Sequence, residues 1–161
     1  EERRATGIFG ILNIRENTVI SSLGKHKRLG FVLSDKSMKK DTQWSIDAMH
    51  TKTPSQETKI RSLSGGNQQK VIIARELESG PSVLVMAHPT RGLDIGATSF
   101  VHDQMIAARA RGVGILLISA DFDEILEMSD RIVVCFEGRI MGEFSGSKPP
   151  INEISLAMTG K

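Results

Sequence analysis

The chain has 161 residues, of which 39% are hydrophobic, and a net charge of +2; this is enough for one domain or part of one. The charges are well mixed and do not form the concentrated basic face of a nucleic-acid binder, so no nucleic-acid partner is expected. The single cysteine, Cys135, cannot form an internal disulfide, which fits a reducing compartment. No apolar run approaches the length of a membrane span.

The first third of the chain is predicted to be mostly helical. An asparagine followed three residues later by a glutamate forms a capping-box pattern and predicts a short helix over residues 14–23. Residues 25–28 read as a basic, solvated turn. A Ser-Asp pair predicts a second helix over residues 35–49, which the proline in segment 51–55 ends, and Trp44 is expected in the core or at a subdomain interface. The apolar side of this helix is expected to carry Met38, Ala48 and Met49.

A strand–helix–strand unit is predicted after the middle of the chain. The continuous apolar runs 83–87 and 115–118 read as strands, and residues 98–111 between them read as a helix. This order predicts a βαβ unit whose parallel strands are buried on both faces. One face of the helix is expected to carry Val101, Met105 and Ala108.

The last part of the chain is predicted to contain a short helix over residues 122–128 and then a β-hairpin. The hairpin strands are residues 131–136 and 139–144, joined by the two-residue turn Glu137-Gly138. A Pro-Pro pair then precedes a terminal helix over residues 151–158.

Residues 63–69, with the sequence LSGGNQQ, begin an apolar-periodic helix. Glycine lets a backbone approach a phosphate closely, and a helix N-terminus presents N–H groups and a partial positive charge to it. An ordinary Ser-Gly helix cap is the alternative for Ser64, Gly65 and Gly66. The full seven residues resemble the signature motif of ATP-binding cassette (ABC) ATPases, and the NQQ ending looks like the simple-sugar and nucleoside importer branch.

This resemblance implies an α/β fold of the P-loop NTPase type, present in part: a helical subdomain, then a parallel βαβ core and a C-terminal β-hairpin. The N-terminal lobe with the phosphate loop would be missing, because G-x-x-x-x-G-K-[ST] occurs nowhere and the chain looks cut from something longer. The implied divisions are residues 1–62 (helical subdomain with the start of the Q-loop), 63–146 (signature helix, ATPase core and hairpin) and 147–161 (tail helix).

Two further segments resemble elements of the same family. Residues 1–4, which include Glu1 and Glu2, resemble the Q-loop segment of sugar importers, which touches the nucleotide metal and the membrane partner; a solvated charged face is the alternative. Residues 89–94, PTRGLD, resemble the D-loop segment. Asp94 would then lie at the interface between two cassettes, and a helix N-cap is the alternative.

The acidic residues that the family uses for hydrolysis are absent. The resemblance implies an aspartate for the Mg²⁺ shell and a glutamate for the attacking water after the first strand, where this chain has Ala87 and His88. Alanine cannot bind a metal, and a histidine that accepts a proton would not replace both roles. The position of the switch histidine holds Ala120. No catalytic residue and no metal ligand is therefore expected in cis.

Two ABC cassettes close head to tail over two nucleotides, so the resemblance implies that this chain completes the site of a partner cassette in trans. Ser64, Gly65, Gly66, Asn67 and Gln68 would contact the nucleotide there, with ATP and Mg²⁺ held at composite sites. The implied partners are a second cassette, membrane permease subunits and, indirectly, a periplasmic or lipoprotein substrate-binding protein. The implied location is peripheral, on the cytoplasmic face of the inner membrane.

The two halves of the sequence resemble different importers. Residues 1–77 look like galactose/methyl-galactoside importers, whereas residues from Ala87 onward look more like nucleoside importers; a divergent member and a hybrid gene both fit. The expected function is that of an ATP-binding subunit fragment that energises import by ATP hydrolysis but is inactive alone. The alternatives are an ABC protein without a membrane partner, and an inactive interaction fragment whose apolar sheet surface is exposed.

Overall fold

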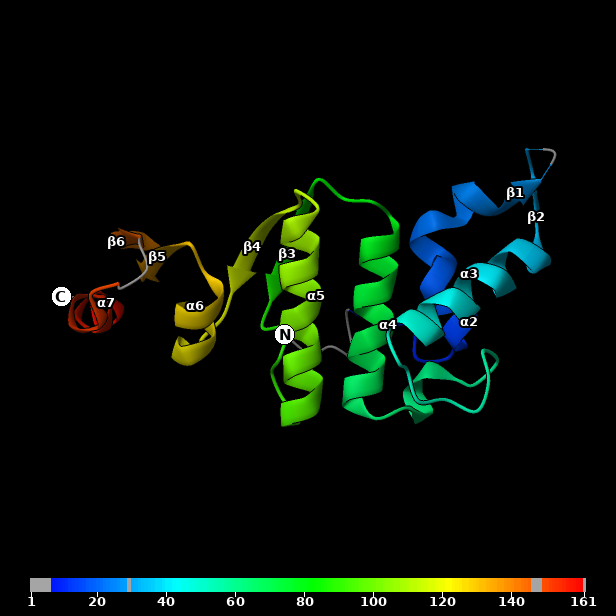
Figure 1. Cartoon of the computed structure of the whole chain (residues 1–161), viewed down its shortest axis with the longest axis horizontal. Coiled ribbons are helices and arrows are strands. Elements are labelled where there is room, and N and C mark those ends of the chain that lie inside the picture. The colour runs from blue at the N-terminus through cyan, green and yellow to red at the C-terminus, as the bar shows by residue number, and fades with distance from the viewer. Residues whose placement is uncertain (1–6, 29, 146–148, 161) are drawn as a thin grey trace. The chain divides into compact units, whose positions relative to one another are not determined.

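A computed structural model describes residues 7–28, 30–145 and 149–160, and Figure 1 shows their helices and strands in chain order. The chain divides into two compact units, Glu1–Leu116 and Leu117–Lys161, and each is described by itself. Within the described ranges, every helix is too short or too polar to cross a bilayer. The division inferred from the family resemblance remains a prediction: residues 1–62, 63–146 and 147–161.

The first unit begins with the predicted capping box. The Asn13 N–H donates to Glu16 Oε2 at 2.9 Å, and the Glu16 N–H donates to Asn13 Oδ1 at 2.8 Å, which satisfies N–H groups that the helix cannot satisfy itself. The helix α2 is shorter than predicted and covers Ile14–Val19. The chain continues as the 3₁₀ segment η1, Ile20–His26, in which Ser22 leaves helical geometry.

The predicted basic turn is partly wrong. Strand β1, Lys27–Arg28, pairs antiparallel with β2, Val32–Leu33. The cationic side chains in this segment are exposed, as expected of a solvated face, but His26 is buried. Its Nδ1 lies 3.0 Å from the hydroxyl of Ser37, and this polar neighbour is available only because α3 packs against η1.

Helix α3, Asp35–Ala48, has nearly the predicted bounds and is capped by Ser34, whose hydroxyl accepts from the Ser37 N–H at 3.3 Å. The prediction for Trp44 is wrong for the chain as described, because this side chain is 62% exposed. The predicted apolar side is also partly wrong, since Ala48 is exposed. The buried positions within α3 are two small polar residues, Thr42 and Ser45.

Helix α4, Gly65–Glu78, follows the short 3₁₀ turn η2, Ile60–Ser62. Val71 on α4 packs into an apolar cluster of this unit. Burial of such side chains stabilises the fold by about 25 cal/mol per Å² of apolar surface. Ile46 and Ile72 cover the cluster from outside. Its buried members are Ile8, Ile14, Ile60, Leu63 and Val71.

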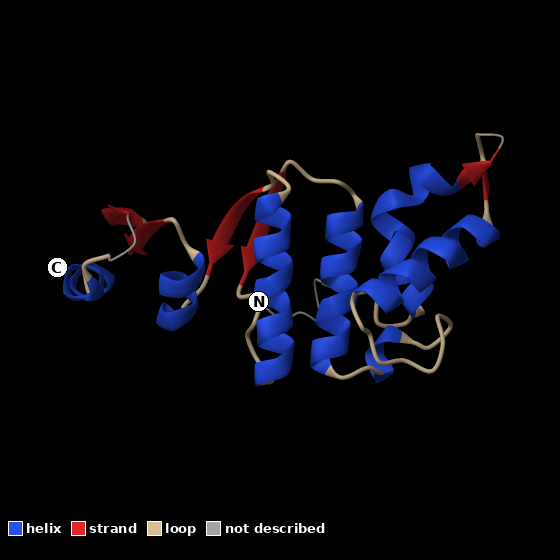
Figure 2. Ribbon diagram, viewed as in Figure 1, coloured by secondary structure: helices blue, strands red, loops and turns tan. Residues whose placement is uncertain are grey.

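The predicted strand–helix–strand unit is present as β3, Val83–Ala87, α5, Ile95–Ala110, and β4, Gly114–Ile118. The two strands are hydrogen-bonded neighbours, and Figure 2 shows their arrows pointing the same way. Helix α5 begins earlier than predicted, because Asp94 caps it. The predicted buried face of α5 is confirmed: Val101, Met105 and Ala108, joined by Ala97.

The expectation that both strands are buried on both faces is wrong within the described residues. Met86 is the buried residue of β3, and β4 alternates between exposed and half-buried side chains. The apolar surface expected in the interaction-fragment alternative is therefore present on this sheet. The exposed large apolar residues on the two strands are Val83, Val85, Leu116 and Ile118.

The second unit matches the predicted elements closely, with α6 at Phe122–Met128, β5 at Arg131–Phe136, β6 at Arg139–Ser145 and α7 at Ile151–Met158. Strands β5 and β6 pair antiparallel, with a bulge between Val134 and Cys135. Both turn residues have positive φ, 45° at Glu137 and 76° at Gly138, as a two-residue type I′ hairpin requires. The core of this unit consists of Ile132, Val134, Ile154 and Ala157.

Candidate functional site

The start of α4 is built by polar side chains that hold one another. Ser64 caps the helix, and its Oγ accepts from the Asn67 N–H at 3.4 Å and from Asn67 Nδ2 at 2.9 Å. The Oδ1 of Asn67 in turn accepts from the Lys52 N–H at 2.9 Å. Asn67 thereby links the segment after α3 to the first turn of α4, while Ser64 itself remains exposed.

Gln68 has a structural role that the sequence reasoning did not identify. The residue is 1% exposed, and its Nε2 donates to the carbonyl of Leu63 at 2.9 Å and to that of Ile60 at 3.3 Å. These carbonyls belong to η2 and the residue before the cap, so Gln68 fixes the approach of the chain to α4. A buried amide without such partners would cost free energy.

Helices α4 and α5 approach each other at their N-terminal ends. A Cβ added at Gly66 would lie 3.1 Å from the Cβ of Ala97, so glycine permits this approach. Asp94 caps α5, with its Oδ1 accepting from the Ala97 N–H at 2.8 Å; the helix-cap alternative for Asp94 is therefore observed, and its role between two cassettes stays a prediction. Figure 1 shows α4 and α5 side by side, beginning at the same end. The N-termini of α4 and α5 therefore place partial positive charge at the same end of this helix pair.

Lys70 adds a cation one turn further into α4, and the sequence reasoning missed it. Its Nζ lies 4.4 Å from the centroid of the Phe100 ring and donates to the carbonyl of His50 at 3.2 Å. The pKa of Lys70 is lowered, first by burial and then by the charge of Lys52, while Asp94 acts in the opposite direction. The sequence feature that could have indicated Lys70 is its spacing, because it lies three residues after Asn67 and so on the same face of the helix.

The end of β3 is chemically different. Ala87 is exposed and has no ligand atom, and His88 is half-buried with a positive φ of 49°. The carbonyl of His88 accepts from the Arg91 N–H at 3.3 Å, which forms the turn into the segment before α5. Mg²⁺ prefers carboxylate and other oxygen ligands, so these two residues do not fit the metal site that the family resemblance implies at this position.

The remaining predicted site residues lie elsewhere. Ala120 is exposed in the second unit, directly before the N-cap of α6. Glu1 and Glu2 lie outside the described residues. The structure thus brings the signature residues and Asp94 to adjacent helix starts, and it leaves the roles predicted for Glu1, Glu2, Asp94 and Ala120 as predictions.

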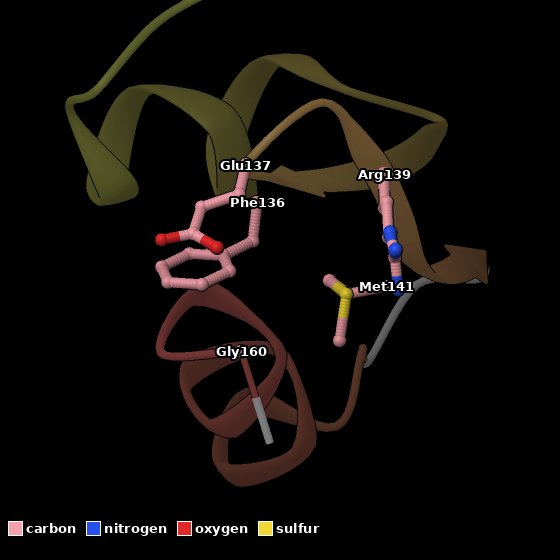
Figure 3. Close-up of a pocket in the computed structure, with 5 residues that line it drawn as sticks. All are labelled: Phe136, Glu137, Arg139, Met141 and Gly160. Atoms are coloured by element: carbon pink, nitrogen blue, oxygen red, sulfur yellow. The ribbon is translucent and has the colours of Figure 1, made fainter.

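A pocket of about 350 Å³ lies within the second unit, between the hairpin and the end of α7 (Figure 3). A Cβ added at Gly160 would lie 2.6 Å from Cε1 of Phe136, so this corner is already filled by the ring. Among the described residues that the sequence predicted as site residues, none lines this pocket. Its lining consists of Phe136, Glu137, Arg139, Met141 and Gly160.

No protein-family model matches the sequence. The galactose/methyl galactoside import ATP-binding protein MglA of Vibrio vulnificus is 46% identical over 154 residues, which is 96% of this chain and 31% of that protein. The MglA protein of Fusobacterium nucleatum gives the same identity and coverage. The chain is homologous to part of an ATP-binding cassette protein. It spans about a third of the length of these relatives.

Solved structures agree with this assignment at the level of the fold. An ATP-binding cassette of an ABC transporter in its ADP conformation has a TM-score of 0.68 at 22% identity, covering 93% of this chain and 60% of that one. A dimeric cassette bound to ADP and Pi has a TM-score of 0.73 at 21% identity, covering 86% and 58%. The predicted fold class, a partial α/β ABC cassette, is therefore confirmed.

Proposed function

We propose that this chain is part of the ATP-binding subunit of an importer for simple sugars such as galactose or methyl galactoside, and that the start of α4 contacts the nucleotide of a partner cassette. The observation that carries the proposal is the exposed Ser64 at the capped start of α4, with Gly65 and Gly66 in the first turn. The names of the related import proteins support the substrate class. The dimer with ADP and Pi among structures of this fold supports action in trans.

The geometry suggests a division of roles within the signature. Ser64 is exposed, and Gly65 and Gly66 are partly exposed, so these three residues are available to a phosphate. Asn67 and Gln68 are engaged with Lys52, Ile60 and Leu63 (as described above) and would position the helix start. The resemblance implies nucleotide contact by residues 64–68. The proposal narrows direct contact to Ser64, Gly65 and Gly66.

The chemistry of this end favours an anion. A hydroxyl and the amides of a helix start are preorganised donors, and such donors stabilise charge that develops on an oxygen in the transition state. Lys70, behind the first turn, contributes positive charge on the same helix. Bound Mg-ATP would supply the phosphate that is transferred to water. Because Ala87 and His88 do not fit a metal site, the proposal assigns no hydrolytic step to this chain's own strand end.

The proposed partners are a second cassette, membrane permease subunits and, indirectly, a periplasmic or lipoprotein substrate-binding protein. The proposed location is the cytoplasmic face of the inner membrane. The exposed Trp44 on α3, with Phe31 near β2, supports a protein contact on the helical part of the first unit. These side chains would meet the permease if the helical part docks as the family resemblance implies.

Nucleoside import is the second candidate. The segments that favour it are residues 87–97, AHPTRGLDIGA, and residues 116–125, LLISADFDEI, which look like nucleoside-type cassettes. Transport assays with the assembled importer would compare labelled galactose, methyl galactoside and a nucleoside. Uptake of the nucleoside alone would replace the sugar assignment and leave the role of the signature untouched.

The decisive experiment is Ser64→Arg in the assembled importer, which places a bulky cation at the start of α4. We expect ATPase activity to fall roughly 10²–10³-fold, the loss typical when a preorganised donor is removed. The matched control is Ser79→Arg, the same change at the exposed opposite end of α4, which should leave activity within about twofold because it lies outside the signature. Unchanged ATPase in Ser64→Arg, with normal assembly, would refute the trans role.

A further inference from the structure

Three ionisable side chains meet where η1, α3 and α4 pack against one another. His26 comes from the end of η1, Asp41 from the middle of α3 and Glu78 from the last turn of α4, and these elements are in mutual contact. One ligand atom from each residue lies within 4.8 Å of the other two. This is the one such group within residues 7–28, 30–145 and 149–160, and it lies apart from the signature at the opposite end of α4.

His26 gives the first indication that the group has a ligand. Its side chain is fully buried, and Nδ1 lies 3.0 Å from the Ser37 hydroxyl. The other ring nitrogen, Nε2, is buried without a hydrogen-bond partner. Buried polar atoms are nearly always paired, because an unpaired one costs about 1–3 kcal/mol. The imidazole therefore has an unused polar atom inside the packed helices.

The two carboxylates give the second indication. Glu78 Oε2 is also buried without a hydrogen-bond partner. Asp41 Oδ2 lies 3.9 Å from Nδ1 of His26, the ring nitrogen that also contacts Ser37. Burial raises the pKa of Glu78, and the negative charge of Asp41 raises it further, while Lys25 and His26 act in the opposite direction. Two acidic groups thus face each other in a partly desolvated place, where a dication would neutralise both.

We infer that His26, Asp41 and Glu78 bind a divalent transition-metal ion such as Zn²⁺, which ties η1 and α3 to the end of α4. One imidazole and two carboxylates are a donor set that suits zinc. Tetrahedral zinc holds its ligand atoms roughly 3.4 Å apart, so the side chains need to close in slightly from their present spacing. Asp41 is 37% exposed, which leaves a route for the ion and room for a water as the fourth ligand.

This site would be structural. The metal would fix the helical part of the first unit to the helix that carries the signature, and it would add a cross-link where the buried positions of α3 are small polar residues. The inference does not depend on the proposed import function, because it concerns metal binding by this chain without nucleotide. A metal-free polar contact between His26 and the two carboxylates is the competing explanation, and it predicts no response to zinc.

The test is titration of the purified chain with zinc chloride, followed by calorimetry and thermal unfolding. All variants carry Cys135→Ser, because the exposed thiol of Cys135 is itself a zinc ligand. We expect one zinc per chain and a rise in Tm of roughly 5–10 °C at a hundredfold excess over Kd. Asp41→Asn and Glu78→Gln keep the side-chain size and should each weaken zinc binding at least about tenfold.

Two control variants separate this site from adventitious binding. Asp47→Asn removes an exposed carboxylate from the same helix, and His50→Asn removes an exposed imidazole at a position with φ of 48°, which asparagine tolerates. Both controls should keep the affinity and the rise in Tm. The inference is overturned if the parent chain shows no zinc-dependent rise, or if the controls lose as much affinity as Asp41→Asn and Glu78→Gln. Because His26→Gln changes a fully buried residue, the two carboxylate variants carry the test.

Discussion

The start of α4 and the end of β3 are the two regions for which the family resemblance implies a role around a phosphate, and they differ sharply in this chain. At the start of α4, Ser64 caps the helix, Asn67 bonds to Lys52 and Gln68 is buried against backbone carbonyls. At the end of β3 stand an exposed Ala87 and a His88 in the left-handed region. One region is held by a network of side-chain hydrogen bonds, and the other has an alanine and a histidine where the resemblance implies two acidic residues.

Under the proposed function, binding a phosphate in trans and hydrolysing one in cis depend on separate residues. The first needs donors at a helix start, which here are held by neighbours in the same unit. The second needs carboxylates at a strand end, and neither alanine nor a lone histidine supplies them. The proposal therefore predicts that changes at the start of α4 affect ATPase activity of the assembled importer, whereas changes at the end of β3 affect stability.

The largest expected effect comes from Gly65→Asp in the assembled importer, where a negative charge at the start of α4 would repel the phosphate. ATPase activity should fall roughly 10²–10³-fold, equivalent to about 3–4 kcal/mol in the transition state. Gly24→Asp introduces the same charge where a Cβ meets nothing within 4 Å and should leave the rate nearly unchanged. Equal losses in both variants would mean that the signature end has no special role.

A second experiment tests the hydrogen bonds that distinguish the start of α4. Gln68→Leu keeps the volume but removes the donor to the Ile60 and Leu63 carbonyls, so urea unfolding should show a loss of about 1–3 kcal/mol. Gln43→Leu, at an exposed position on α3, should change stability by less than about 0.5 kcal/mol. If Gln68→Leu were as stable as the parent chain, the proposed positioning role of Gln68 would be wrong.

A third experiment addresses the end of β3. His88 has φ of 49°, a region that disfavours β-branched side chains, so His88→Val should lower the free energy of unfolding by about 1–2 kcal/mol. His88→Asn should be close to neutral, because asparagine tolerates this region. Thermal unfolding of the two variants gives the comparison, and a valine variant as stable as the asparagine variant would show that the turn is not strained.

The smallest expected effect concerns Asp35, in the first turn of α3, which provides a helix start to compare with that of α4. A hydrogen bond from Lys39 lowers the pKa of Asp35 below its usual value of 3.8, and Arg15 lowers it further against the opposing effect of desolvation. Since the folded pKa lies below the unfolded one, the stabilisation is present above about pH 3.8 and is lost as pH falls through the folded pKa.

Asp35→Asn should therefore lower stability slightly at neutral pH, and the difference from the parent chain should disappear in acid. Unfolding curves measured across pH give the test. Asp47→Asn, at the other end of α3, serves as the control, because a carboxylate there opposes the helix dipole and its loss should not destabilise. A difference for Asp35→Asn that persisted below the folded pKa would assign the effect to packing rather than to charge.

Most element boundaries could be predicted because their causes are local. The capping box at Asn13 and the two-residue turn at Glu137 are each determined by residues close in sequence. The same holds for the apolar face of α5. The start of α5 was placed too late, because Asp94 was interpreted mainly through its family motif although it also satisfies the helix-cap pattern. The identity of the signature was also local, since seven consecutive residues carry it.

Burial and side-chain pairing depended on contacts between distant segments. Trp44 is a large aromatic residue that is exposed, and His26 is an ionisable residue that is buried. Neither burial state can be inferred from the neighbouring residues in the sequence. Gln68 reaches carbonyls up to eight residues earlier, and Lys70 meets a ring on α5. The contacts of Gln68 and Lys70 depend on how the helices pack, so the sequence alone could not predict them.

The sequence by itself determined the order of the elements, the start of the α4 helix and the absence of acidic side chains at Ala87 and His88, because caps, turns and motifs act over a few residues. Only the tertiary structure decided that α4 and α5 approach each other near their starts, at Gly66 and Ala97, and that a histidine and two carboxylates converge at the other end of α4. The physical reason is that such approaches depend on which helix faces pack together, and packing is a property of the whole unit.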